Sequence, residues 1–151
     1  MNYVPLQIKT SYSLLSSLIN IKDLINKAKE YNITSLAIAD INSMYYVMEF
    51  YHECLNNNIK PIIGLELTIN NYKLLMYAKD YKGYQNLCKI TTIKSEREVN
   101  YSDLKKYNDN IIIIIPYSSK DLYNDIKDIY LDIYLGYTNL NQRQELLTIN
   151  P

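Results

Sequence analysis

The chain has 151 residues, and its 16 basic and 16 acidic side chains give a formal net charge of zero. This length suits one domain with a substantial hydrophobic core and is short for two, so we expect a single domain over residues 1–151. Arg97 and Arg143 are the only arginines, whereas a free-standing module that binds duplex DNA normally presents a basic face. Autonomous DNA binding is therefore not supported.

The sequence has none of the usual features of a membrane or exported protein. No apolar run reaches the length of about 18 residues that a membrane-spanning helix needs. The first residues, MNYVPLQIK, lack the apolar segment of a secretory signal peptide. We therefore expect a cytoplasmic protein without membrane contacts.

The first half of the chain alternates between strand and helix patterns. Val4, Leu6 and Ile8 alternate with polar neighbours, which is typical of a strand. Asn20 is the predicted N-cap of an amphipathic helix that ends near Tyr31. The next predicted elements are a strand over residues 35–40, a helix capped by Ser43 and a strand over residues 59–69. The apolar stripe of the helix after Ser43 is predicted to hold Met44, Val47, Met48, Tyr51 and Leu55.

The second half begins with a predicted hairpin. Asn70 and Asn71 turn the chain into an antiparallel strand, since asparagine tolerates positive φ. Residues 92–100 are polar and unpatterned, which predicts an exposed loop. Five consecutive isoleucines, 111–115, predict a strand that is covered on both faces. The other predicted elements are a strand over 73–78, a helix over 80–91, a short helix over 102–108, a helix capped by Ser118 or Ser119, a strand over 131–135 and helical turns within 138–151.

This order of elements predicts the fold class. Strands that alternate with helical segments indicate an α/β fold with a mainly parallel sheet, and we count six strands. In such folds the functional residues gather where the strands end. Gln7 and Lys9 lie near the end of the first strand and Asp40 at the end of the second. We expect a site at these strand ends.

Four segments of the chain resemble a known family, in the family's own order. The segments are LQIKTSYSLL (6–15), SLAIADINSMY (35–45), EFYHECLNNNIKPIIGLEL (49–67) and LLMYAKDYKGYQNLCKI (74–90). They resemble the opening of the PHP (polymerase and histidinol phosphatase) domain, and most closely the PHP domain that begins the alpha subunit of bacterial DNA polymerase III. The resemblance is dense up to about residue 90, thin over 91–110, and weak but collinear through residue 136.

The resemblance implies a particular architecture. A complete PHP domain is a distorted βα barrel of about seven strands with its helices outside. With six predicted strands, this chain would form an incomplete barrel, either as a truncated gene product or as a shortened module with an open barrel. An unclosed barrel would expose edge strands and the isoleucine run 111–115, so we expect self-association or poor solubility.

The resemblance also identifies former metal-site positions. In active members the first strand ends in His-x-His and the second carries Asp-His, and the bound metals activate a water that hydrolyses a phosphoester. The His-x-His positions here hold Gln7 and Lys9, and Ile41 replaces the histidine after Asp40. Of the family's acidic ligands, Asp40 and Glu66 are present. This set is too poor in donors for a multinuclear site, so we expect no metal cofactor.

Lys9 suggests what replaces the metal. An ammonium group among the strand ends repels divalent cations, yet it can neutralise the carboxylates that remain. We therefore predict an ion pair from Lys9 to Asp40, to Glu66 or to both. The only histidine, His52, falls within the second predicted helix, away from every strand end, and is not expected to bind a metal.

Two functions follow from the resemblance. The first is a non-catalytic scaffold: the N-terminal PHP-like domain of a replicative DNA polymerase III alpha subunit, a DNA-directed DNA polymerase (nucleotidyltransferase) of DNA replication. Its implied partners are the remainder of the alpha subunit and other replisome subunits, with DNA contacted only through the full-length polymerase. The alternative is a metal-dependent phosphoesterase or 3′–5′ proofreading exonuclease, with zinc or manganese in a reduced site built on Gln7, Asp40, Glu66 and further residues.

Overall fold

The computed structural model describes residues 3–149, and the chain divides into two compact units. The first unit ends at Glu66 and the second begins at Leu67. In the described part of the chain, no helix is long and apolar enough to cross a membrane. Strand β2 (Lys60–Ile69) passes from the first unit into the second.

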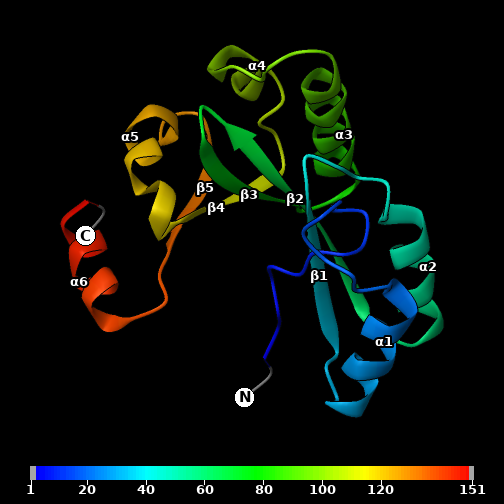
Figure 1. The fold of residues 1–151 in the computed structure, drawn as a ribbon. Coiled ribbons are helices and arrows are strands. Elements are labelled where there is room, and N and C mark those ends of the chain that lie inside the picture. The colour runs from blue at the N-terminus through cyan, green and yellow to red at the C-terminus, as the bar shows by residue number, and fades with distance from the viewer. Residues whose placement is uncertain (1–2, 150–151) are drawn as a thin grey trace. The chain divides into compact units, whose positions relative to one another are not determined.

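Unit 1 combines a pair of parallel strands with helices that pack together beside β1 (Figure 1). Its elements are α1 (Ile21–Glu30), β1 (Ser35–Ile41), α2 (Val47–Asn56) and the first residues of β2. Strands β1 and β2 run parallel, in a register that pairs Ser35 with Lys60 and Ile41 with Glu66. The sequence prediction of parallel strands alternating with helices is therefore confirmed in this unit.

The predicted first strand is not formed, and this is the main correction in unit 1. Residues 4–9 do run beside β1: the Ala37 N–H donates to the Pro5 carbonyl (3.2 Å) and the Ala39 N–H donates to the Ile8 carbonyl (2.9 Å). The two acceptors are three residues apart instead of two, and Pro5 has no N–H to donate. A regular ladder is therefore interrupted, and the described residues contain five strands where six were predicted.

Helix α1 begins as predicted, whereas α2 does not. The Asn20 side chain accepts a hydrogen bond from the Asp23 N–H (2.8 Å) and caps α1. Helix α2 begins only after Tyr46, without a side-chain cap, so the predicted cap at Ser43 is wrong. Its predicted apolar stripe is also mostly wrong, because the buried residues of α2 are Val47, Phe50 and Cys54. Met48, Tyr51 and Leu55 are exposed.

Unit 2 is built on three strands with β4 in the middle. Strand β4 runs antiparallel to β3, pairing Ile113 with Met76, and parallel to β5, pairing Ile113 with Ile133. Its elements are β3 (Tyr72–Ala78), α3 (Tyr81–Glu96), α4 (Tyr101–Lys106), β4 (Ile111–Pro116), the 3-10 helix η1 (Tyr117–Leu122), α5 (Tyr123–Ile126), β5 (Asp132–Gly136) and α6 (Leu140–Ile149). Helix α3 and η1 both pack on β3. The α/β class is confirmed here as well.

The hairpin and the isoleucine strand largely follow the sequence. Asn70 and Asn71 both adopt positive φ, at 47° and 66°, as the predicted two-residue turn requires. In β4, every second isoleucine is completely buried, while Ile112 and Ile114 are only partly covered. The prediction that both faces are covered therefore holds fully for one face and partly for the other.

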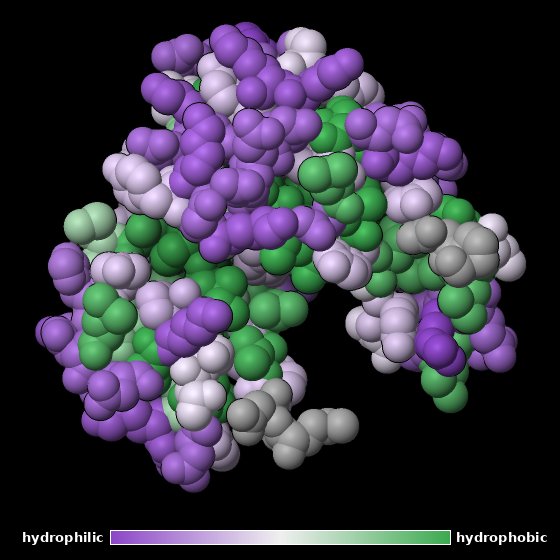
Figure 2. All heavy atoms as spheres, turned by 180° about the vertical axis from the view of Figure 1, so that it is seen from behind, coloured by the Kyte–Doolittle hydropathy of each residue, from purple (hydrophilic) through white to green (hydrophobic). Residues whose placement is uncertain are grey.

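Helix α3 is longer than predicted. It continues to Glu96, through part of the segment 92–100 that was predicted to be a loop. Hydroxyl groups in this polar stretch bond within the helix: Thr92 donates to the Cys88 carbonyl (2.9 Å) and Ser95 to the Thr92 carbonyl (2.7 Å). The surface over α3 and α4 is mainly hydrophilic (Figure 2). The loop prediction is therefore wrong for residues 92–96, which form a solvated part of the helix, and confirmed for residues 97–100.

A bidentate ion pair connects the end of α3 to the start of α4. The two terminal guanidinium nitrogens of Arg97, Nη1 and Nη2, each lie 2.7 Å from one carboxylate oxygen of Asp103. Asp103 also accepts the Asn100 N–H (3.0 Å), while the Asn100 side chain accepts the Asp103 N–H (3.0 Å). The Arg97 guanidinium and the Asn100 backbone lower the pKa of Asp103 to about 2.

This ion pair predicts a loss of stability in acid. Because the folded state lowers the pKa of Asp103, the stabilisation is complete above the ordinary carboxyl pKa near 4 and is lost as the pH falls toward about 2. We expect a loss of about 1 kcal/mol, since the half-exposed Arg97 is screened by solvent. Urea denaturation across this pH range should show the stability difference between the wild type and Asp103→Asn shrinking. The exposed control Asp121→Asn should show a constant difference, and parallel pH profiles for both variants would contradict the prediction.

Candidate functional site

Asp40, at the carboxyl end of β1, is completely buried and fully hydrogen-bonded. Its carboxylate accepts three short bonds from the segment before α1. They come from the Thr10 N–H (2.6 Å), the Thr10 hydroxyl (2.6 Å) and the Ser13 hydroxyl (2.6 Å). A buried carboxylate requires such donors, because leaving water without them is costly. We call this arrangement of Thr10, Ser13 and Asp40 the hydroxyl clamp.

Glu66 lies in the neighbouring strand β2, where its pairing with β1 ends, and is also completely buried. The Lys9 ammonium group lies 3.1 Å from its Oε2 atom, and the Gln7 amide nitrogen donates to the same oxygen at 3.1 Å. The predicted ion pair is therefore confirmed for Glu66. Among residues 3–149, no ion pair joins Lys9 to Asp40.

The register of β1 and β2 explains why these carboxylates share one end of the strand pair. Asp40 is opposite Leu65, and Ile41 is opposite Glu66. Ile41 contributes its backbone, whose N–H donates to the Ser13 hydroxyl oxygen (2.9 Å). Four of the five predicted site positions thus lie where parallel strands end or beside that end, with Gln7 reaching them from the extended segment.

A buried tyrosine hydroxyl holds the two strands in place behind the site. The Tyr46 hydroxyl accepts the Gly64 N–H (3.0 Å) and lies within donating distance of the Ile38 carbonyl (2.8 Å) and the Gly64 carbonyl (2.6 Å). In a parallel ladder with Ile38 opposite Ile63, the Gly64 N–H would normally reach the Ile38 carbonyl directly. The Tyr46 hydroxyl therefore bonds to buried backbone groups of both strands at this rung of the ladder.

An open pocket adjoins the Lys9 side of the site. It has a volume of about 330 Å³ and is lined by Gln7, Ile8, Lys9, Ser16, Ser17 and Ile19. The Ser17 hydroxyl donates to the Lys9 carbonyl (2.7 Å). This bond connects the two lining stretches, residues 7–9 and residues 16–19. The pocket is therefore a product of the segment before α1.

His52 lies apart from these groups. It is exposed on α2 and makes an edge-on ring contact with Tyr51, with ring centroids 6.0 Å apart. Among the described residues 3–149, no group of three or more histidine, cysteine, aspartate or glutamate side chains is arranged to hold a metal. The donors around Asp40 and Glu66 are hydroxyl, amide and ammonium groups, which fit carboxylates and do not fit a divalent cation.

Sequence reasoning missed the residues that satisfy Asp40. Thr10 and Ser13 follow the first extended segment. Hydrophobic periodicity does not indicate which residue their hydroxyls bind. A usable signal was nonetheless present: small hydroxyl residues directly after one strand-like segment and an aspartate at the end of the next predicted strand. Parallel neighbours would bring these groups together.

Comparison with known proteins identifies related sequences. A model of the PHP domain family matches residues 5–145. DNA polymerase III subunit alpha of Halalkalibacterium halodurans is 37% identical over 128 residues, which cover 78% of this chain and 12% of that protein. The same subunit of Bacillus subtilis is 36% identical over 126 residues, covering 77% of this chain and 11% of the relative. The chain therefore spans only a small part of these relatives.

Solved structures with low sequence identity share the fold. A protein from Bifidobacterium adolescentis, proposed to be a metal-dependent phosphoesterase, superposes with a TM-score of 0.64 at 10% identity, covering 97% of this chain and 82% of its own. An amidohydrolase from Chromobacterium violaceum, with bound sulfate and no metal, gives a TM-score of 0.65 at 9% identity, covering 98% and 82%. At these identities the likeness establishes the fold alone.

The contact between Lys9 and Glu66 predicts energetic coupling. Because Glu66 is buried, removing the ammonium group leaves a carboxylate without its compensating charge. A double-mutant cycle with Lys9→Met and Glu66→Gln should give a coupling energy of about 1 to 3 kcal/mol in urea denaturation. The exposed pair Lys27 and Glu30 serves as the control and should give about 0.5 kcal/mol or less. Equal coupling in both cycles would show that Lys9 does not stabilise Glu66.

The hydroxyl of Tyr46, which contacts both strands, predicts a specific loss of stability on its removal. Tyr46→Phe removes the group that bridges buried backbone atoms of β1 and β2, so we expect a destabilisation of about 1 to 3 kcal/mol. Its neighbour Tyr45 is exposed, and Tyr45→Phe should change the free energy of unfolding by about 0.5 kcal/mol or less. Chemical denaturation of both variants measures the difference. Equal stabilities would mean that the backbone groups of Ile38 and Gly64 do not depend on the Tyr46 hydroxyl.

Proposed function

The chain belongs to the PHP domain family, and on this basis we propose that it is the N-terminal PHP domain of a bacterial DNA polymerase III alpha subunit, serving as a non-catalytic scaffold. Under this proposal, Gln7, Lys9, Asp40, Ile41 and Glu66 are former metal-site positions. The parent protein is a DNA-directed DNA polymerase of the cytoplasm. This domain contributes structure to it and no catalytic residue.

The observation that carries the proposal is the ammonium group of Lys9 beside Glu66. A divalent metal would need the Glu66 carboxylate as a ligand, and a cation 3.1 Å from that carboxylate competes for the same negative charge. Gln7 donates to the same oxygen and reinforces the competition. The charge that a metal would supply is thus provided by a side chain of the protein.

The hydroxyl clamp supports the same proposal from the other carboxylate. Both oxygens of Asp40 already accept hydrogen bonds, two of them at Oδ1 and one at Oδ2. A metal at Asp40 would have to displace the Thr10 or Ser13 hydroxyl and leave it buried without a partner. The residues present therefore favour a structural role for Asp40 over metal ligation.

The proposed partner is the remainder of the alpha subunit, with other replisome subunits and DNA engaged through the full-length polymerase. The matched segments cover only 12% and 11% of the two named relatives, which are therefore several times longer than this chain. In unit 1, Leu14, Leu15 and Leu18 are almost fully exposed on the segment before α1. Leu15 also has a φ of 61°, which is unfavourable for a side chain of this kind. Exposed apolar residues in a strained loop suit a surface that another polypeptide covers.

The second candidate function is a metal-dependent phosphoesterase or 3′–5′ proofreading exonuclease with zinc or manganese in a reduced site. The observation in its favour is the fold, which is shared with a protein proposed to be a metal-dependent phosphoesterase. Gln7, Asp40 and Glu66 would then be its ligands. The two functions differ in a measurable property, the affinity of this site for metal.

Metal titration separates the two functions. With zinc or manganese chloride, isothermal titration calorimetry of the chain should show no stoichiometric binding that depends on Asp40, because its oxygens and the Glu66 charge are already satisfied. The wild type and the isosteric variant Asp40→Asn should give the same binding heats. A parallel assay with a simple aryl phosphodiester should show no metal-dependent hydrolysis above the metal alone.

Two controls define the outcome of this titration. His52→Ala removes the only imidazole and reports adventitious zinc binding on α2. Stoichiometric binding that survives His52→Ala but is lost in Asp40→Asn would overturn the scaffold proposal. If that binding is accompanied by diester hydrolysis, the phosphoesterase function replaces it.

A further inference from the structure

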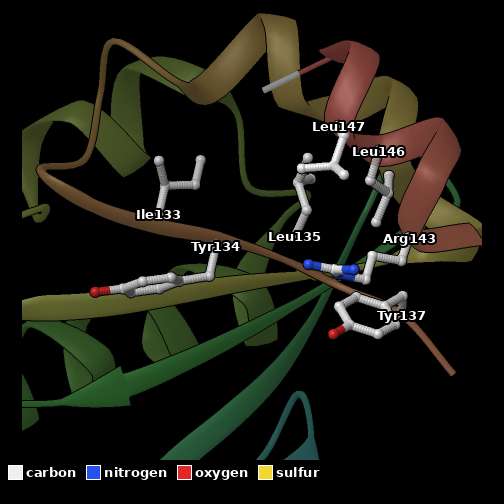
Figure 3. A pocket seen from close by; sticks show the side chains of 7 residues that line it. All are labelled: Ile133, Tyr134, Leu135, Tyr137, Arg143, Leu146 and Leu147. Atoms are coloured by element: carbon white, nitrogen blue, oxygen red, sulfur yellow. The ribbon is translucent and has the colours of Figure 1, made fainter. Parts of the chain in front are cut away.

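We draw no further inference here: the strongest candidate, the small apolar pocket that β5 and α6 form around Arg143 (Figure 3), carries nothing because nothing in the structure shows what covers this face of unit 2.

Discussion

Two completely buried carboxylates, Asp40 and Glu66, determine how unit 1 is arranged. A carboxylate removed from water must be compensated by donors or by an opposite charge, and the penalty for failing to do so is large. The compensation comes from one stretch of chain, residues 7–13, which supplies an amide, an ammonium group, two hydroxyls and a backbone N–H. The extended segment and the turn before α1 are held in place largely by these bonds.

The same constraint accounts for the irregular start of the fold. Residues 4–9 lie along β1 but are held by side-chain contacts at their end as much as by backbone pairing. The last residues of this segment face Glu66, and the residues that follow surround Asp40. The segment therefore does not form a regular ladder with β1 along its whole length. Tyr46 then fixes the strands behind the site, and β1 and β2 remain parallel to the point where the carboxylates emerge.

Local sequence patterns predicted most elements of this fold and part of its site. Strand β4 and the asparagine turn after β2 follow from the local sequence alone. An isoleucine run favours a strand and asparagine tolerates positive φ, whatever the distant contacts are. The buried face of α2 could not be read in this way, since Met48 and Phe50 are both apolar and only packing decides between them. The ion pair of Lys9 was predictable because the family resemblance placed Lys9 among the carboxylates of the predicted site. The hydroxyl clamp was missed. The positions of Thr10, Ser13 and Asp40 after strand-like segments hint that they meet, but their individual bonds depend on a turn whose geometry no periodicity encodes.

The hydroxyl clamp also limits how this site can change during evolution. A single mutation that introduces histidine at position 7, 9 or 41 would face an aspartate whose oxygens are already engaged by Thr10 and Ser13. A metal centre at this position would require the loss of those bonds together with several new ligands. The bonds that Asp40 makes to Thr10 and Ser13 are therefore reason enough for an aspartate to be kept at this position, as a folding residue.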